Sequence, residues 1–272
     1  MPFRRRMKGN PMKTSRLIAM MVGLACVAPA SQAADLGPIR ENCTLSAGEK
    51  AGTLRLQTDK GDCHEHRHCG NNMSDIPMSR FTGLSLADFA QSGAHLTATL
   101  TAEAGTFACS GTVAQNELDG KAVFTPDEAF VARMGKMGFS GYDSEKLMAY
   151  ALLDVDSQWA RSLQEIGVPE MTADNLIALH IFRVDPTYVR SLTSLGYAMP
   201  TADQLISLSV QGVNGEEVKE IRALGYQPTI DQLIQIRIFN ITPDFIQRMQ
   251  ARGLKDLTID KLVQIRIFKL AD

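Results

Sequence analysis

The sequence predicts an α+β protein, in which a small antiparallel β domain precedes an α-solenoid of five helix-pair repeats of about 29 residues each. The first observation is a change of period. Apolar and polar residues alternate in parts of 34–124, whereas apolar residues recur at helical spacing in 125–272. The second is a glycine that follows an apolar helical run five times, at steps of 29, 29, 29 and 28 residues. These glycines are Gly138, Gly167, Gly196, Gly225 and Gly253.

Residues 1–33 have the pattern of a secretory signal peptide. Six basic residues and no acidic residue occur in 1–16, and an apolar run follows from Leu17 to Ala28. Ser31-Gln32-Ala33 then supplies the small residues of a cleavage site. We therefore expect the mature chain to begin at Ala34 and to be periplasmic or secreted.

Three features limit what the mature chain can do. Removing the signal takes away six basic residues, which changes the formal net charge from −2 to about −8 and disfavours nucleic acid and anionic membranes as partners. No later apolar run reaches the roughly 18 residues of a membrane-spanning helix. A lipid anchor at Cys26 would need a better lipobox than Gly23-Leu24-Ala25. The start, at Met1 or Met12, stays open.

The β domain is expected to cover residues 34–124. Alternating runs predict strands, which we place at 53–58, 95–100, 107–113 and 121–124. A further strand at 76–81 would lie at an edge because of Pro77, and 84–90 is typical of a short helical turn. Asp119-Gly120 has the residue types of a tight turn. A sheet or sandwich of about 90 residues has a small core, so disulfides and packing against the first repeat would help to stabilise it.

Four cysteines follow the signal, namely Cys43, Cys63, Cys69 and Cys109. An even number of cysteines in an exported chain is typical of disulfides, and four cysteines allow three pairings. We favour Cys63–Cys69 together with Cys43–Cys109, because a Cys63–Cys69 bridge suits a loop that joins two strands. The other two pairings stay open.

The segment between Cys63 and Cys69 contains His64, His66 and His68. Residues 64–68 also match H-E-x-x-H, in which a helix places two histidines on one zinc ion and the glutamate activates a bound water. Turn-forming residues flank the segment on both sides. In addition, six residues of helix rise about 9 Å, whereas bridged Cα atoms lie within about 7 Å. A Cys63–Cys69 bridge therefore excludes the helical motif.

Three interpretations of this segment follow. It forms a polar loop that is closed by a disulfide and holds no ligand, or it binds zinc or copper through all three histidines. The third interpretation is a zinc hydrolase that uses His64, Glu65 and His68. Its further zinc ligand would then be His95 or Glu103.

Each repeat of 125–272 is expected to contain two short helices. The first opens with a capping residue and often a proline, as at Thr125-Pro126, Asp185-Pro186 and Thr242-Pro243. The repeat glycine ends it. The second helix opens at a threonine with an aspartate in its first turn, at Thr172, Thr201, Thr229 and Thr258. Apolar positions surround almost all of this second helix, which predicts an inner, mostly buried layer.

One position of the second helix, four residues after its first leucine, changes from repeat to repeat. It is occupied by Ala151, His180, Ser209, Arg237 and Arg266. Stacked repeats would align these side chains in a ladder. The structural interpretation pairs the two arginines with acidic residues of neighbouring repeats and places His180 in the core. The functional interpretation is a recognition strip for an acidic peptide or ligand, formed by His180, Ser209, Arg237 and Arg266.

The last repeat is expected to make a contact of its own. No polar capping unit follows it, and an uncovered apolar face usually meets a partner. Residues around Ile265, Ile267, Phe268 and Leu270 would therefore bind another protein or a second copy of this chain.

The motifs resemble a bacterial region of β domain and helical repeats that stands alone in secreted proteins or follows membrane peptidases of the BlaR type. The resemblance is carried by F-T-P-x-x-x-F (Phe124–Phe130), V-x-P-x-Y-V-R-x-L-x-x-L-G-Y (Val184–Tyr197) and L-I-x-x-R-I-F (Leu233–Phe239), and it would cover nearly the whole mature chain. It implies an extracytoplasmic sensing or interaction module. It implies no peptidase role, because this chain lacks a run of transmembrane helices and its H-E-x-x-H lies between two cysteines.

The sequence therefore predicts an exported, non-enzymatic scaffold that senses or binds another envelope protein or a peptide through its repeat surface. It contains no glycine-rich phosphate loop and no G-x-S-x-G motif. A metal-binding envelope protein is the first alternative, and the zinc hydrolase is the second.

Overall fold

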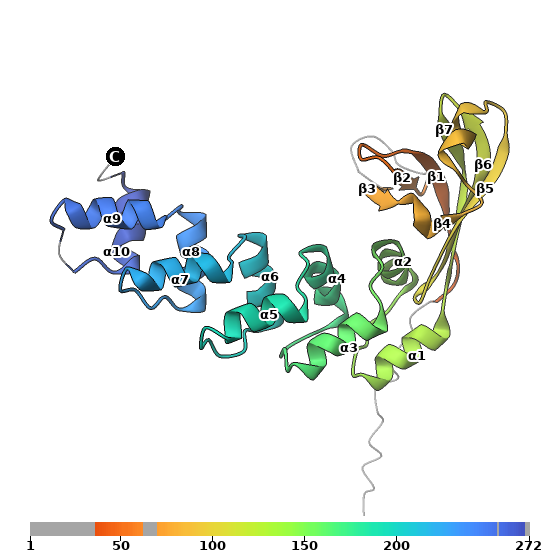
Figure 1. Cartoon of the computed structure of the whole chain (residues 1–272). Helices are drawn as coiled ribbons and strands as arrows, with labels where there is room; N and C mark the ends of the chain where they lie inside the picture. The colour runs from red at the N-terminus through yellow and green to blue at the C-terminus, as the bar shows by residue number, and fades with distance from the viewer. Residues whose placement is uncertain (1–35, 62–69, 255, 270–272) are drawn as a thin grey trace, which may run out of the picture. The chain divides into compact units, whose positions relative to one another are not determined.

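The computed structural model describes residues 36–61, 70–254 and 256–269. Within them, a curled antiparallel sheet of seven strands is followed by ten short helices, which confirms the α+β class (Figure 1). The strands are β1 (Ile39–Ala47), β2 (Thr53–Asp59), β3 (Gly70–Pro77), β4 (Phe81–Thr82), β5 (His95–Ala102), β6 (Gly105–Ala114) and β7 (Glu117–Pro126).

The helices are each eight to ten residues long. They are α1 (Glu128–Lys136), α2 (Ser144–Leu153), α3 (Ser157–Glu165), α4 (Ala173–Ile181), α5 (Pro186–Thr193), α6 (Ala202–Val210), α7 (Gly215–Ala223), α8 (Ile230–Ile238), α9 (Pro243–Ala251) and α10 (Ile259–Ile267).

The strand order in the sheet is β3-β2-β1-β7-β6-β5-β4, and all neighbours are antiparallel. The strand β1 was not predicted, although it pairs with both β2 and β7. Its inward-facing residues are Glu41, Cys43 and Leu45. A charged residue at an inward position hides the alternation that would have indicated a strand.

Two predicted details of the sheet are wrong. Asp119 and Gly120 lie inside β7 rather than in a turn, and the turn before β7 is made by Gln115 and Asn116, both at positive φ. The predicted strand at 76–81 is instead the end of β3, a 3-10 helix η1 (Met78–Arg80) and the short β4. Pro77 does lie in an edge strand, as its missing N–H favours.

A disulfide joins Cys43 of β1 to Cys109 of β6, as preferred from the sequence. The strand β7 lies between these two strands, and two strand spacings would separate them by about 9.5 Å in a flat sheet. The Cα atoms are 6.1 Å apart because the sheet is curled. Gly120 pairs with Cys43 on one side and Gly111 on the other. A Cβ atom there would lie 2.0 Å from the carbonyl oxygen of Ser110, so the site requires glycine.

The helix boundaries follow the predicted capping residues, with one exception. Asp185 and Thr242 cap α5 and α9 with a proline next to each cap, and threonines 172, 201, 229 and 258 cap the even-numbered helices from α4 onward. The exception is Thr125-Pro126, which belongs to β7. There Pro126 pairs with Gly105, and Asp127 caps α1. The five repeat glycines all have positive φ and follow the odd-numbered helices.

We call α2, α4, α6, α8 and α10 the inner helices. Each contacts the next one in this order, and α2 also packs on β5, β6 and β7 (Figure 1). Their first leucines are almost fully buried: Leu147, Leu176, Leu205, Leu233 and Leu262. Near α2, the rings of Phe130, Tyr142 and Tyr150 meet edge to face at 5.5 to 6.2 Å. The apolar core therefore runs from the sheet through α2 into the later helices.

Candidate functional site

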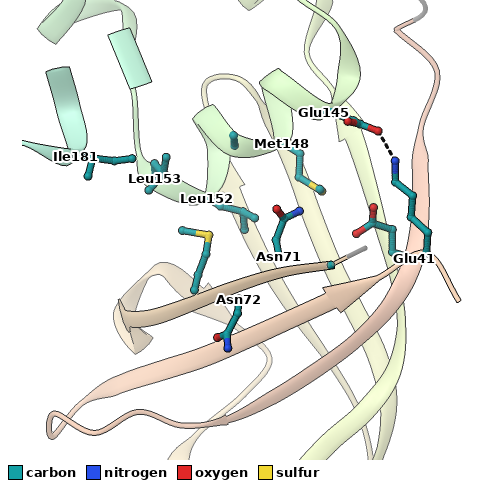
Figure 2. A pocket seen from close by; sticks show the side chains of 12 residues that line it. Glu41, Asn71, Asn72, Glu145, Met148, Leu152, Leu153 and Ile181 are labelled. Carbon is teal, nitrogen blue, oxygen red and sulfur yellow. Dashed lines mark hydrogen bonds and ion pairs between the residues drawn. The ribbon is translucent and has the colours of Figure 1, made fainter. Parts of the chain in front are cut away.

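A cleft of about 550 Å³ lies between the edge strand β3 and helix α2 (Figure 2). One wall is apolar and consists of Met148, Leu152 and Leu153 of α2, together with Met73 of β3 and Ile181 at the end of α4. Met148 and Leu152 are one helical turn apart, so the same face of α2 presents both. The cleft is therefore formed by elements on either side of the junction between sheet and helices.

The other end of the cleft is polar. It is lined by Glu41 of β1, Lys60, Asn71 of β3 and Glu145 of α2, and Figure 2 shows the side chains of Glu41, Asn71 and Met148 converging on it. Lys60 forms an ion pair with Glu145, and both side chains are more than half exposed. Solvent screens such an exposed pair, so it contributes little to stability.

Glu41 stands apart from these rim charges because it is only 7% exposed. One of its carboxylate oxygens, Oε2, is buried and has no hydrogen-bond partner among the residues that the structure describes. Leaving a buried charged acceptor unsatisfied costs more free energy than burying an apolar group of the same size. The sequence analysis did not identify Glu41 as a functional residue. A single acidic residue in a strand that was itself not predicted belongs to no pattern that could have indicated it.

The edge of β3 borders the cleft. Four consecutive residues, 70–73, line it, although successive side chains of a strand point to opposite faces of the sheet. The backbone of β3, and not one face alone, therefore lies against the cavity. Among the described residues β3 pairs with β2 and with no other strand, so its outer backbone groups have no ladder partner.

The predicted ladder residues reach back to the preceding inner helix. Ser209 donates a hydrogen bond to the carbonyl oxygen of Phe182 at 2.5 Å, and Arg237 donates from Nε to that of Gln211 at 2.8 Å. Arg266 donates to the carbonyl oxygen of Asn240 at 3.1 Å. Phe182 and Gln211 are the C-cap residues of α4 and α6, and Asn240 follows the C-cap of α8. Carbonyls at such helix ends have no intrahelical donor, so the three side chains supply the donors.

His180 holds the same position in α4. Its ring lies edge-on to Trp159, with 4.9 Å between the ring centroids. Burial lowers the pKa of His180, while the nearby Asp154 and Asp156 and the carbonyl of Leu153 oppose that shift. The histidine is thus partly buried and packed on an aromatic ring, at the edge of the core and not within it.

The two arginines differ in their partners. Arg237 forms an ion pair with Glu217 of α7 at 3.2 Å, an acidic residue of the same helix pair and not of a neighbouring repeat as predicted. Arg266 instead lies over the ring of Phe245, 3.9 Å from its centroid. A binding role of His180, Ser209, Arg237 and Arg266 toward an acidic ligand stays a prediction.

Arg80 of η1 donates hydrogen bonds to carbonyls at the end of α2, as Ser209, Arg237 and Arg266 do at the ends of later inner helices. Its guanidinium donates to the carbonyl oxygens of Ala151 at 2.7 Å and Leu152 at 2.6 Å, and it pairs with Asp154 at 3.0 Å. Sequence reasoning missed this residue because it lies 71 positions away from its acceptor Ala151. Position in the repeat could not have indicated it.

Helices α4, α6, α8 and α10 are less buried than the mostly buried layer that the sequence predicted. The fifth residue after the first leucine is apolar in every repeat, and in four of them it is about half exposed. These residues are Ile181 (50%), Val210 (48%), Ile238 (54%) and Ile267 (50%). Each is the last residue of its inner helix. We call these four residues the apolar row.

The predicted metal site falls on residues that are not described. His64, Glu65, His66 and His68 lie outside the described ranges, as do Cys63 and Cys69. Within 36–61, 70–254 and 256–269, no group of three potential metal ligands comes together.

The two suggested further zinc ligands lie at opposite ends of β5, which puts them on the order of 20 Å apart. His95 is exposed at the start of the strand. Glu103 follows its end and accepts a hydrogen bond from the backbone N–H of Ser157 at 2.9 Å. Glu103 therefore already has a structural partner at the start of α3.

The described helices include none with the length and apolar character needed to cross a membrane. Comparison of the chain with protein-family models, curated proteins and solved structures found no match.

Proposed function

We propose that the protein is an exported, non-enzymatic scaffold that binds another envelope protein or a peptide through the apolar row and the adjoining cleft. The observation that carries this proposal is the recurrence of one half-exposed aliphatic residue in four successive inner helices. Single exposed apolar residues are ordinary, but a repeated set on neighbouring elements is typical of a surface that meets a partner. Ile181 belongs both to the row and to the lining of the cleft, so the two features adjoin.

The helical half would act as a solenoid of five units, each made of an odd-numbered helix and the following inner helix. Three observations support this arrangement: the successive contacts of the inner helices, the threonine cap of each later inner helix and the side chains that reach back to the preceding unit. In such an array each unit contacts mainly its neighbours, and a position that repeats in sequence also repeats along one surface.

Export and sensing outside the cytoplasm complete the proposal. The disulfide between Cys43 and Cys109 fits an oxidising compartment, and the signal-like pattern of residues 1–33 fits delivery to one. The formal charge of about −8 without that segment makes a nucleic acid an unsuitable partner.

The test is site-specific photo-crosslinking in the protein's own host cell. A photoreactive residue at Val210, in the row, should give a crosslinked adduct with a partner protein, whereas the same residue at the exposed Glu220 of α7 should not. The change Ile238→Asp in the Val210 probe protein should remove the adduct, because a charge in the row opposes burial of apolar surface. Equal labelling from Val210 and Glu220, or an adduct that Ile238→Asp leaves unchanged, would show that the row is not a binding surface.

A further inference from the structure

We propose that the cleft between β3 and α2 receives a lysine or arginine side chain from an extended segment of a partner protein, and that this segment adds to the outer edge of β3 as a further strand. The inference rests on the proposed function and specifies the chemistry of the partner. It is drawn from three properties of the cleft: its apolar walls, its buried carboxylate and its strand edge.

The shape and lining of the cleft fit a long basic side chain. Met148 and Leu152 of α2 and Met73 of β3 provide an apolar passage for a chain of methylene groups. Glu41 closes the passage with a carboxylate, and Figure 2 shows that carboxylate directed into the cavity. Lysine and arginine carry an apolar stem that ends in a cation, which is the complementary pattern.

Glu41 itself supplies the strongest indication that something binds. Its Oε2 is buried and lacks a hydrogen bond within the described part of the chain. A cationic donor from a ligand would satisfy that oxygen and neutralise a desolvated charge in one step. Lys60, a cation that also lines the cleft, forms its ion pair with Glu145.

The strand edge can hold the backbone of the ligand. Exposed edges of sheets bind extended peptides by continuing the hydrogen-bond ladder, and pockets beside the edge then select particular side chains. In β3 the two halves differ. Asp75 has φ of 61° beside a register shift, and Pro77 has no N–H to donate, so pairing at that end is interrupted. Residues 70–73 pair regularly with β2 and are the ones that line the cleft.

The test uses two pools of acetylated, amidated nine-residue peptides with randomised flanks. One pool carries lysine at the central position and the other carries norleucine, which has the same carbon stem without the charge. The exported protein should bind the lysine pool at least about tenfold more tightly, as expected for a charge-assisted hydrogen bond to a buried group. Hydrogen exchange of the amides of β3 should slow when the lysine pool is bound.

Variants connect this preference to Glu41. Glu41→Gln keeps the size and shape of the side chain but removes its charge, and it should reduce the ratio between the two pools to about one. Glu145→Gln, at the exposed rim, is the matched control and should change the ratio less than about threefold. A second probe, the best lysine peptide methylated at alternate backbone nitrogens, should lose binding in one of the two methylation patterns, because strand addition uses alternate N–H groups.

The results separate this inference from the proposed function. Three results would overturn the inference: equal binding of both peptide pools, a lysine preference that persists in Glu41→Gln, and no binding of either pool. The last result is also expected if the chain itself or a second copy already fills the cleft. In each of these cases, crosslinked adducts from the Val210 probe would still support the proposed function as a binding scaffold. A lysine preference without such adducts would mean that the protein binds through the cleft and that the apolar row is not a binding surface.

Discussion

Helix α2 and the later inner helices share one repeat pattern, but they have different surroundings. Leu152 of α2 and Ile238 of α8 occupy the same position relative to the first leucine of their helices. Leu152 is 3% exposed because the sheet and η1 cover the end of α2, whereas Ile238 is 54% exposed. A residue at the same position of the sequence pattern thus belongs to the core in one helix and to the surface in another. The environment that decides between these roles comes from the β domain.

The largest expected effect comes from loosening the cover of α2. The disulfide closes a sequence separation of 66 residues between β1 and β6, and removing it through Cys43→Ala with Cys109→Ala should lower the free energy of unfolding by about 4 kcal/mol. Urea unfolding, monitored by hydrogen exchange, would check this. We expect α2 to lose protection together with the sheet and α8 to keep most of its own. Equal loss in α2 and α8 would show that the two regions unfold as one unit.

The paired substitutions Leu152→Ala and Ile238→Ala test the comparison itself. Truncating a buried leucine removes apolar contacts and leaves a cavity, so Leu152→Ala should cost about 3 kcal/mol of unfolding free energy. The same truncation at the exposed Ile238 should cost less than about 0.5 kcal/mol. Urea denaturation of both variants gives the two numbers. Similar costs would mean that the apolar row is buried in solution, for instance between copies of the chain.

Much of this architecture could be predicted from local signals. Caps, prolines and glycines act within one helical turn, so the sequence placed the starts of α4 to α6 and α8 to α10 correctly. Strand β1 was missed because Glu41 interrupts its apolar alternation. The apolar row was missed because periodicity shows which residues are apolar and not which of them a neighbour covers.

The cleft could not have been predicted at all from these patterns. It joins residues of β1, β3, α2 and α4, whose separation in the sequence reaches 140 positions between Glu41 and Ile181. Only the residues of α2 and α4 belong to the repeat pattern, and that pattern does not indicate which strands they face. Arg80 likewise acts on a helix far along the chain, and only the fold brings the two together. Long-range pairing of this kind depends on the topology of the sheet, which no local signal specified.

The end of α2 and the ends of the later inner helices also differ in the side chains that donate hydrogen bonds to their carbonyls. Arg80 serves two carbonyls and Asp154 at the end of α2, and its side chain is 17% exposed. Arg80→Met should therefore cost about 2 kcal/mol of unfolding free energy, because it leaves these acceptors unsatisfied. Ser209 serves a single carbonyl at the end of α4, so Ser209→Ala should cost about 1 kcal/mol. Denaturant unfolding would measure the loss of unfolding free energy in both variants. A larger loss for Ser209→Ala would contradict the expectation that the side chain at the end of α2 contributes more to stability than the one at the end of α4.

The smallest expected effect is a pH dependence of the unfolding free energy that arises from His180 alone. Burial lowers the pKa of His180 in the folded protein, so the unfolded chain binds the proton at a higher pH than the folded one does. Stability should therefore fall as the pH drops through about 6.5, the ordinary value for histidine, and this contribution should vanish above it, where both states are neutral. Urea unfolding between about pH 7.5 and pH 5 should show a shallower decline for His180→Gln than for the unsubstituted protein. Ser209→Ala, which changes the same position in α6 without a titrating group, should leave the slope unchanged. If the unfolding free energy of His180→Gln depended on pH as that of the unsubstituted protein does, the His180 ring would be hydrated in both the folded and the unfolded state. His180 would then be as exposed to solvent as the apolar row beside it.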